Sequence, residues 1–327
     1  MNEPALPRIV PITPNALPIG WRTFFAKHRI QLHVLVLYEN EAENGKYWPA
    51  REIIARGLAR GDHRDANTVI DSTSGNFGVS LATVVRQENE RDPGFPIKNV
   101  ACVVPISLPQ GKRDRLEKHG VRLINAKDSL DAMRVAKCEA QKRGWWLTGQ
   151  YWNVDNSRGY WRIAGHIAEK LPMLGMAAWG VGSGGGCSGV MPVLDRSFAQ
   201  RSFKLHRVAV VLEDGHKIGG VRDEAALEPG TLKWRAPNID DVCFVEADPS
   251  YKFSAALWRE GIPVGPSTGF ACEGASQAAR KLAIMRLLDT IRAPDGFVHI
   301  LAPALDKRGP YRSEYGDRKI LFSSPDA

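Results

Sequence analysis

The stretch Asp71-Ser72-Thr73-Ser74-Gly75-Asn76-Phe77-Gly78 follows a short apolar run, Thr68-Val69-Ile70, and precedes a helix-like segment at 79–88. A strand that turns through Ser, Thr, Gly and Asn into a helix presents hydroxyls and backbone N–H groups at the positive end of that helix, where an anion binds. The simpler interpretation is an ordinary N-cap in which Ser74 or Asn76 satisfies the first turn, and the octet alone favours it. Only the rest of the chain can decide between an N-cap and a site for a carboxylate or phosphate.

Strand-like and helix-like segments alternate along the remaining sequence. Strands are expected at 31–39, 100–105, 121–124, 145–147, 177–181, 208–212, 241–245 and 297–301. Helices are expected at 48–60, 112–119, 129–143, 156–171, 190–200, 249–260 and 271–288. Residues 1–30 are rich in Pro, show little periodicity and are expected to wrap a surface. The alternation predicts an α/β protein with mainly parallel sheets.

Length and charge bound the class of protein. A chain of 327 residues can bury a full core, in one two-lobed unit or in two domains. Hydrophobic residues make up 43% and charged residues 24%, which is ordinary for a globular protein. The net charge of +8 comes from dispersed Lys and Arg residues without a nucleic-acid-binding motif, so we expect no nucleic-acid partner.

The cysteines and the N-terminus indicate the compartment. The five cysteines form no C-x-x-C pair, which argues against a disulfide framework or a zinc site and suits a reducing environment. No basic region followed by an apolar core opens the sequence, and no apolar run has the length of a membrane span. We therefore expect a cytoplasmic protein with no metal site and no membrane partner.

The strongest local signal is the glycine cluster at 180–189, Gly-Val-Gly-Ser-Gly-Gly-Gly-Cys-Ser-Gly. Glycines let the backbone approach a ligand closely and direct successive N–H groups at a phosphate, with the dipole of the next helix behind them. Gly180, Gly182 and Gly185 also fit G-x-G-x-x-G, so an NAD-dependent oxidoreductase is a competing interpretation. The acidic residues after the next strand, Glu213 and Asp214, come later than that motif requires.

Three other stretches are ambiguous when taken singly. Lys46 has no local mark of reactivity, and any one lysine is most simply a solvated side chain. Gln150-Tyr151-Trp152-Asn153 follows an expected strand and reads as a polar turn. Pro266-Ser267-Thr268-Gly269 precedes an expected helix and reads as an N-cap.

In their order along the chain, however, these stretches resemble the pyridoxal-phosphate enzymes of the tryptophan-synthase-β fold, also called fold type II. The resemblance is to their cysteine synthase and cystathionine β-synthase branch, and it covers roughly residues 30–312. Thr73–Gly78 is similar to the T-S-G-N-T-G substrate loop. Lys46 lies 76 − 46 = 30 residues before Asn76, as the Schiff-base lysine of the family does.

The later blocks of the family follow in order. Gln150–Asn153 resembles Q-F-x-N, and Gly182–Gly186 resembles the G-T-G-G-T cup for the cofactor phosphate. His216–Gly220 is similar to the H-K-I-Q-G segment at the mouth of the active site. The stretch 259–269 is similar to the family's segment that leads into its G-I-S-S-G turn. The first serine of that turn contacts the pyridine nitrogen in the family and corresponds to Ser267.

The sequence departs from the family at two of these blocks. Around the lysine, G-S-x-K-D-R is replaced by Asn44-Gly45-Lys46-Tyr47-Trp48, so the usual aspartate and arginine are missing. The phosphate cup ends in Gly186 instead of a hydroxyl residue, a loss that Ser188 or Cys187 could compensate.

A third departure follows the mouth segment, where Arg222 stands in place of the small residues of the cysteine synthases. A guanidinium there would favour an anionic leaving group such as phosphate, or an acidic nucleophile, through bidentate pairing. A surface salt bridge to Asp223 or Glu224 is the alternative.

The resemblance implies a two-domain α/β fold with the active site in the cleft between the domains. Residues 40–150 would form the smaller domain, and residues 1–39 with 151–327 the larger, cofactor-binding domain. It also implies a homodimer.

The site residues that the resemblance implies fall into two sets, with Lys46 serving as both cofactor anchor and general base. The cofactor set is Lys46, Asn76, Gly182, Ser183, Gly184, Gly185, Gly186 and Ser267. The substrate set is Thr73, Ser74, Gly75, Asn76, Gln150, Gly220 and Arg222. With Ser267 as its partner, the ring nitrogen of pyridoxal 5'-phosphate would be neutral, which favours β-elimination over transamination.

The implied activity is β-replacement on an activated serine of the O-acetylserine or O-phosphoserine type. The reaction would pass through an aminoacrylate, take up a small nucleophile and give cysteine or another β-substituted alanine. The alternatives are a serine/threonine dehydratase-like β-elimination, a non-catalytic binding protein that keeps the fold, and the oxidoreductase suggested by the glycines.

Overall fold

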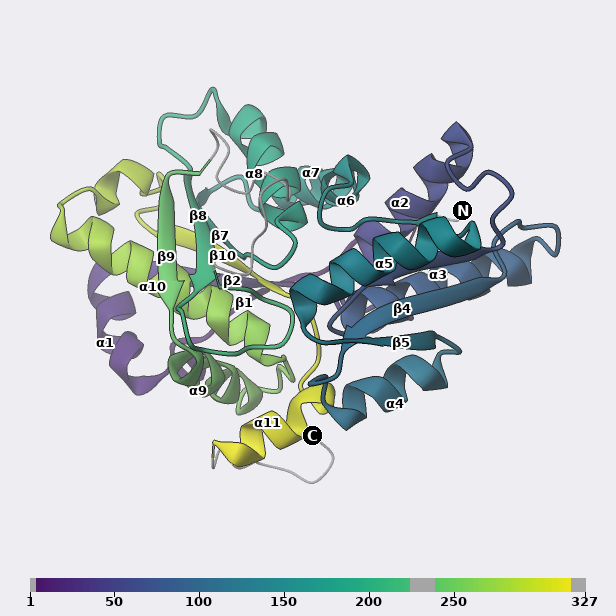
Figure 1. The fold of residues 1–327 in the computed structure, drawn as a ribbon. Coiled ribbons are helices and arrows are strands. Elements are labelled where there is room, and N and C mark those ends of the chain that lie inside the picture. The colour runs from purple at the N-terminus through teal and green to yellow at the C-terminus, as the bar shows by residue number, and fades with distance from the viewer. Residues whose placement is uncertain (1–3, 224–238, 319–327) are drawn as a thin grey trace.

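The computed structural model describes residues 4–223 and 239–318. Their strands form two sheets, each covered by helices on both faces (Figure 1). All neighbouring strands are parallel except one pair at the edge of the larger sheet. The predicted α/β fold with mainly parallel sheets is therefore confirmed.

The larger sheet has six strands and joins the two ends of the chain. Its order is β1 (Ile9–Pro11), β2 (Ile30–Val36), β10 (Val298–Ala304), β7 (Leu174–Gly180), β8 (His206–Leu212) and β9 (Asp241–Val245). The antiparallel pair is β1 with β2. Because β10 is inserted between β2 and β7, this sheet is completed only by the last strand in the described part of the chain.

Helices cover the larger sheet on both faces, which explains the continuous apolar runs of its central strands. One face packs against α1 (Ile19–His28), α9 (Ala247–Trp258) and α10 (Pro266–Ile284). The other packs against α7 (Trp161–Lys170) and α8 (Gly185–Phe198). Three short 3-10 helices complete the lobe built on the larger sheet: η1 (Pro14–Ala16), η2 (Leu288–Ile291) and η3 (Gly309–Tyr311).

The smaller sheet has four parallel strands, all from the middle of the chain. Its order is β5 (Arg122–Ala126), β4 (Asn99–Pro105), β3 (Thr68–Ser72) and β6 (Trp146–Leu147). Alternate residues of β3 and β4 face different helices. One face packs on α5 (Ser129–Arg143), and the other on α2 (Tyr47–Arg60), α3 (Asn76–Arg91) and α4 (Gln110–Lys118).

Two short helices connect parts of the two lobes. The helix α6 (Val154–Arg158) contacts both α2 and α8. The helix α11 (Arg312–Asp317) lies below the lobes in Figure 1, next to α4. The domain boundaries at residues 40 and 150 remain a prediction. No helix in the described part of the chain has the length and apolar character needed to cross a bilayer.

The expectation that residues 1–30 lack periodicity is wrong. They contain β1 and α1, and the aromatic residues Trp21, Phe24, Phe25 and His28 of α1 recur at helical spacing. These rings pack edge-on or tilted against one another, and Trp21 Nε1 donates to Glu273 Oε2 of α10 at 2.8 Å. The prolines that precede this aromatic spacing, the last of them Pro18, obscured it.

The expected helix 156–171 is also wrong as a single element, because the chain forms α6 and α7 with a break at Gly159-Tyr160. A Cβ at Gly159 would lie 2.6 Å from the Pro49 Cα, so the break allows α2 to pack closely here.

Candidate active site

One cavity collects most of the predicted site residues from both lobes. It is lined by ten of them: Lys46, Thr73, Ser74, Asn76, Gln150, Gly182, Ser183, Gly220, Arg222 and Ser267. Several lie where parallel strands end, which is the usual position of ligand sites in α/β sheets. The other four predicted residues, Gly75, Gly184, Gly185 and Gly186, belong to the same loops and helix starts but do not line the cavity.

Lys46 projects into this cavity from the N-terminal end of α2. Its backbone N–H donates to Asn44 Oδ1 at 2.9 Å, and the N–H of Gly45 donates to the Leu305 carbonyl at 2.6 Å. Its Nζ donates to Ser183 Oγ at 3.2 Å. Burial first, and the charge of Arg222 second, lower the pKa of Lys46 from 10.5 to about 8. The geometry thus holds a lysine whose neutral, nucleophilic form is accessible near neutral pH.

The loop of the opening octet joins β3 to α3. Thr73 Oγ1 accepts the N–H groups of Gly75 and Gly78 at 3.0 and 3.4 Å, so this threonine makes the cap-like contacts expected of Ser74 or Asn76. Gly75 has a φ of 129°, a backbone conformation that favours glycine. Ser74 is exposed toward the cavity, at the N-terminal end of α3. An N-cap and an anion-binding loop are therefore compatible here.

Gln150 is held against this loop by Asp71, a residue that the sequence did not single out. Asp71 is buried and accepts from Gln150 N at 2.9 Å and from Thr148 Oγ1 at 2.5 Å. Burial raises the pKa of Asp71 to about 6, although these hydrogen bonds oppose the shift. Gln150 Nε2 donates to the Ser72 carbonyl at 2.7 Å, which fixes the side chain beside the end of β3.

The glycine cluster forms a tight turn into α8, with Gly184 at a φ of 80°. A Cβ at Gly182 would lie 2.4 Å from the Gly220 carbonyl oxygen, and one at Gly186 would lie 1.9 Å from Trp179 Nε1. The turn therefore needs glycines, and its backbone N–H groups lie at the N-terminus of α8, the end of a helix that favours an anion.

The residues near this turn fit a phosphate group. Ser188 Oγ is buried and has no hydrogen-bond partner in the described part of the chain, whereas Cys187 Sγ donates to the Trp179 carbonyl. Of the two proposed replacements for the missing hydroxyl, Ser188 therefore has the free hydroxyl group. A phosphate at this helix N-terminus could accept a hydrogen bond from it.

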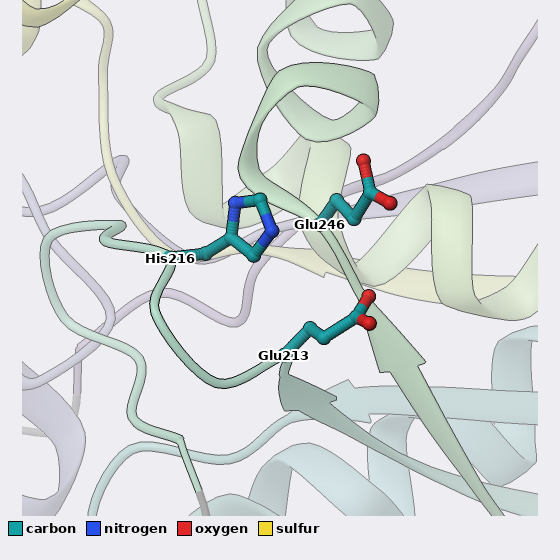
Figure 2. A group of neighbouring side chains, drawn as sticks. All are labelled: Glu213, His216 and Glu246. Atoms are coloured by element: carbon teal, nitrogen blue, oxygen red, sulfur yellow. The ribbon is translucent and has the colours of Figure 1, made fainter.

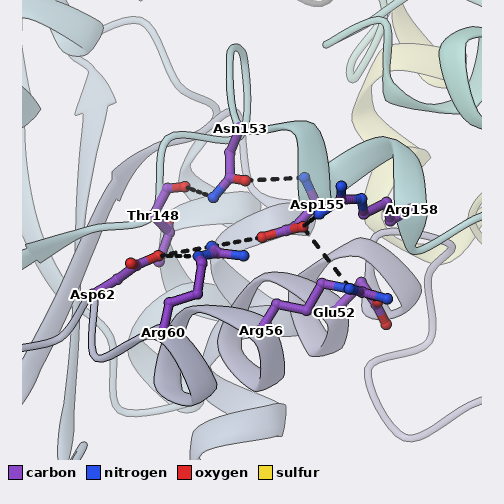
Figure 3. A network of polar contacts seen from close by, with 8 residues as sticks. All are labelled: Glu52, Arg56, Arg60, Asp62, Thr148, Asn153, Asp155 and Arg158. Carbon is purple, nitrogen blue, oxygen red and sulfur yellow. Dashed lines mark hydrogen bonds and ion pairs between the residues drawn. The ribbon is translucent and has the colours of Figure 1, made fainter.

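A buried carboxylate, that of Asp155, joins α6 to α2 (Figure 3). Asp155 lies 2.7 Å from Arg60 Nη2 and 2.9 Å from Arg158 Nη1, with Arg56 Nε at 3.9 Å. The next residue, Asn156, donates from Nδ2 to Ser183 Oγ at 3.0 Å. The network thus holds α6, which carries Asn156, against the helix that begins directly after Lys46.

Ser267 lies in the first turn of α10 and donates from Oγ to Asp306 Oδ1 at 2.9 Å. Asp306 follows β10, is buried and lines the same cavity. Its Oδ2 accepts from Asn76 Nδ2 at 2.9 Å and from the hydroxyl of Tyr311. Asp306 was missed from the sequence, although its position just beyond the last parallel strand was a usable signal.

Arg222 faces the cavity. Its Nη2 donates to the Tyr151 hydroxyl at 2.7 Å, and its guanidinium carbon lies 4.3 Å from the centroid of the Tyr151 ring. Its backbone N–H donates to the Val181 carbonyl at 3.0 Å, which holds the segment beside the glycine turn. Glu224, one of the surface partners considered above, lies outside the described residues.

Glu213, His216 and Glu246 gather beside the mouth segment (Figure 2). Their potential ligand atoms all lie within 4.8 Å of one another. Both glutamates are exposed, and His216 Nδ1 accepts the N–H of Ala247 at 3.5 Å. Because exposed acidic groups commonly meet without an ion, we assign no metal to this cluster.

The family follows from a comparison with known proteins. Residues 44–286 match the family described as pyridoxal-phosphate dependent enzyme. The chain therefore belongs to the pyridoxal-phosphate dependent enzymes, and its cofactor is pyridoxal phosphate. The oxidoreductase and the non-catalytic binding protein are set aside by this membership.

The curated relatives narrow the class to cysteine synthase-like enzymes. A cysteine synthase of Staphylococcus aureus (strain Mu50 / ATCC 700699) is 25% identical over 289 residues, which cover 83% of this chain and 88% of the relative. An N-(2-amino-2-carboxyethyl)-L-glutamate synthase of Ralstonia nicotianae (strain ATCC BAA-1114 / GMI1000) is 30% identical over 269 residues, 76% of each chain.

Solved structures share the fold. An O-ureido-L-serine synthase superposes with a TM-score of 0.77 at 21% identity, over 98% of this chain and 95% of that chain. An O-acetylserine dependent cystathionine beta-synthase from Helicobacter pylori superposes with a TM-score of 0.76 at 21% identity, over 94% of each chain. The predicted fold type II architecture and the resemblance to the cysteine synthase branch are thereby confirmed.

Proposed function

We propose that this enzyme catalyses β-replacement on an activated serine, of the O-acetylserine or O-phosphoserine type, to give cysteine or another β-substituted alanine. The observation that carries the proposal is the single cavity lined by Lys46, the Thr73–Asn76 loop, Gln150, Ser183 and Ser267. The relatives support it, because they are synthases of cysteine and of a substituted amino acid.

The residues divide into those that hold the cofactor and those that hold the substrate. Lys46 Nζ is the amine that would bind the cofactor, with Gly182–Gly186 and Ser188 at its phosphate and Ser267 at its ring. When bound, pyridoxal phosphate supplies an electron sink for the electrons released at the substrate Cα. Lys46 Nζ would also take the Cα proton as general base, a role that its lowered pKa supports.

The substrate carboxylate would bind at the N-terminus of α3. Ser74 and the turn into the helix present a hydroxyl and backbone N–H groups to the cavity, and Gln150 lies beside them. A carboxylate there has its charge complemented by the helix dipole, so the Cα–H bond can be oriented toward Lys46.

Arg222 would select for a second anionic group on a substrate. Its guanidinium lies in the cavity lining and is oriented by Tyr151. A phosphate leaving group or the carboxylate of an acidic nucleophile would pair with it in bidentate fashion. The Ralstonia relative supports this assignment, because it is a synthase of a glutamate derivative.

The experiment that tests the proposal combines the spectrum of the bound cofactor with product analysis. We expect a yellow protein whose visible band is lost on borohydride reduction, and we expect Lys46→Ala to lack the band. Incubation with an activated serine and a nucleophile should give a β-substituted alanine without a stoichiometric release of pyruvate. Pyruvate as the main product would replace the proposal by the dehydratase-like elimination, and a colourless protein that ignores added cofactor would refute it.

We further propose a cytoplasmic homodimer with the predicted division at residues 40 and 150. The proposal rests on the family resemblance and on the two separate sheets. Light scattering on the purified enzyme tests the dimer, since a monomer at micromolar concentration would exclude it.

A further inference from the structure

We propose that Arg115 is a positioning residue for the cofactor: it fixes the amide of Asn76 so that the N–H side, and not the carbonyl oxygen, faces the ring. The inference rests on the proposed function, which places Asn76 among the residues that hold the cofactor. Arg115 belongs to α4 of the smaller lobe and does not itself line the cavity, so it acts through Asn76.

Two contacts hold the guanidinium of Arg115 against the start of α3 and the loop before Lys46. Its Nη1 donates to Asn76 Oδ1 at 3.3 Å, and its Nη2 donates to the Ala42 carbonyl at 2.9 Å. The same carbonyl accepts from Asn44 Nδ2 at 2.7 Å, and Asn44 Oδ1 accepts the backbone N–H of Lys46 at 2.9 Å. Arg115 is therefore tied to two cofactor residues at once, to Asn76 directly and to Lys46 through its loop.

The two ends of the Asn76 amide have nearly equal size and opposite hydrogen-bonding character. A guanidinium carries only N–H donors and no acceptor, so only the amide oxygen can face Arg115. With Oδ1 on Arg115, Nδ2 lies 2.9 Å from Asp306 Oδ2 and 3.5 Å from the Tyr311 hydroxyl. Both Asn76 and Asp306 line the cavity, so the N–H side of the amide is the side turned toward it.

Asp306 alone would not define this orientation. Burial raises the pKa of Asp306, although hydrogen bonds from neighbouring side chains oppose the shift. A carboxyl group that holds a proton both donates and accepts, so either end of an amide can face it. The guanidinium of Arg115 stays charged and never accepts a hydrogen bond. Arg115 therefore decides which end of the Asn76 amide is presented to the cofactor.

An amide N–H presented in this way suits the ring of pyridoxal phosphate, which carries a phenolic oxygen. Because Nδ2 has two hydrogens, Asn76 can keep one on Asp306 and donate the other to this ring oxygen. Arg115 also strengthens the donor, since a cation on the amide oxygen draws electrons away from the amide nitrogen. A residue outside the cavity thereby contributes to the affinity for the cofactor.

The test compares pyridoxal phosphate with 3-deoxypyridoxal phosphate, an analogue without the phenolic ring oxygen, in fluorescence titrations of apo-enzyme. We expect Arg115→Met to bind pyridoxal phosphate about tenfold more weakly than the wild type does, which corresponds to the loss of one hydrogen bond. It should bind the deoxy analogue as tightly as the wild type does, because the analogue offers Asn76 no oxygen. Arg115→Lys should recover part of the loss, since an ammonium is also a donor without an acceptor.

Arg113→Met is the matched control. Arg113 lies two residues earlier in α4 and is likewise half-buried. It donates to Asn125 and to the carbonyls of Leu108 and Pro105, none of which is a site residue. Its replacement should leave the affinity for both compounds unchanged, so it separates the contact with Asn76 from the general loss of an arginine on this helix.

An equal loss on both compounds in Arg115→Met overturns the inference, because the arginine would then act on the fold and not through Asn76. Unchanged affinity for pyridoxal phosphate overturns it as well. If Arg115→Met does not fold, Arg115→Gln decides, since its amide can also accept and no longer selects one side of Asn76; it should show the same contrast between the two compounds. A wild type that develops no visible band with pyridoxal phosphate refutes the proposed function instead.

Discussion

At the scale of single residues, Lys46 shows how the fold prepares a common side chain for chemistry. Burial and the nearby guanidinium of Arg222 both disfavour its ammonium form. With a pKa of about 8, about one tenth of the side chains are neutral at pH 7, against roughly 0.03% for a lysine with the usual pKa of 10.5. Only the neutral amine attacks an aldehyde, so this difference acts on the rate of cofactor capture.

Apo-enzyme should therefore capture pyridoxal phosphate with a rate that rises through about pH 8 and then levels off. The rate rises with pH because Lys46 loses its proton, and it levels off early because the lowered pKa completes this deprotonation at a lower pH than for an exposed lysine. Stopped-flow absorbance between about pH 6.5 and 9.5 measures it. In Arg222→Gln the midpoint should move to higher pH. A wild-type rate still rising at pH 9.5 would contradict the prediction.

Substrate preference is the second consequence at this scale. Arg222→Ala should lower kcat/KM for O-phosphoserine by about 10- to 100-fold, because a charge-assisted pair is worth roughly 1.5–3 kcal/mol. The loss for O-acetylserine should be much smaller. Tyr151→Phe, which removes only the hydroxyl that orients the guanidinium, should give an intermediate loss on O-phosphoserine. Equal losses on both substrates would reject the role of Arg222.

At the scale of elements, three helices begin at the site and not where their apolar periodicity begins. α3, α8 and α10 start at Asn76, Gly185 and Pro266, whereas the sequence predicts starts at 79, 190 and 271. Apart from Phe77, the first turn of each consists largely of polar residues and glycines at the cavity or cup, so it shows no periodic apolar pattern. Helix starts are therefore least predictable where they matter most for binding.

The pieces of the candidate site that match the family's blocks in their order along the chain were predicted from the sequence, namely Lys46, the Thr73–Asn76 loop, Gln150, the glycine cup and Ser267. Asp306 was not predicted, because it reaches its site partners across a long separation in the sequence. Asp306 is 39 residues from Ser267 and 230 from Asn76, and a lone acidic residue after a strand has no motif of its own. Only the packing of β10 beside β2 and β7 brings it to the cavity.

The α8 turn gives a prediction at this scale. Gly186→Ala should weaken cofactor retention and lower the free energy of unfolding by about 1–3 kcal/mol, because its Cβ would overlap the buried Trp179 ring. Gly165→Ala in α7 is the control, since its Cβ meets nothing within 4 Å and should stabilise the protein by about 0.5–1 kcal/mol. Urea unfolding measures the free energy of unfolding of both variants, and dialysis measures how well each retains the cofactor. Two variants of equal stability would contradict the close packing.

At the scale of the whole molecule, the described C-terminal part of the chain connects the lobes. Glu314 of α11 lies 3.0 Å from Lys112 Nζ of α4, and Tyr251 of α9 also hydrogen-bonds Glu314. The two charged side chains are only 10% and 20% exposed, so water screens them poorly. The Lys112 ammonium also lies 4.5 Å from the centroid of the Tyr311 ring, close to the partners of Asp306.

Lys112→Met should lower the free energy of unfolding by about 1–3 kcal/mol, because Glu314 loses a charged partner in a partly buried place. Arg134→Met is the control, because it removes an exposed partner of Asp131 within α5. This variant should change the free energy of unfolding by less than about 1 kcal/mol. Denaturant titration of both variants checks the contrast. A Lys112 variant as stable as the Arg134 variant would show that this contact does not hold α11 to α4.

The placement of β10 between β2 and β7 also fixes the order in which a nascent chain can fold. The smaller sheet is complete once β6 has left the ribosome, whereas the larger sheet waits for residue 304. Until then β2 and β7 each present an apolar edge that another chain could pair with. The greatest risk of aggregation therefore falls late in synthesis. Because Asp306 comes last among the site residues, a growing chain has the lysine and the glycine cup well before the cavity can close around the cofactor.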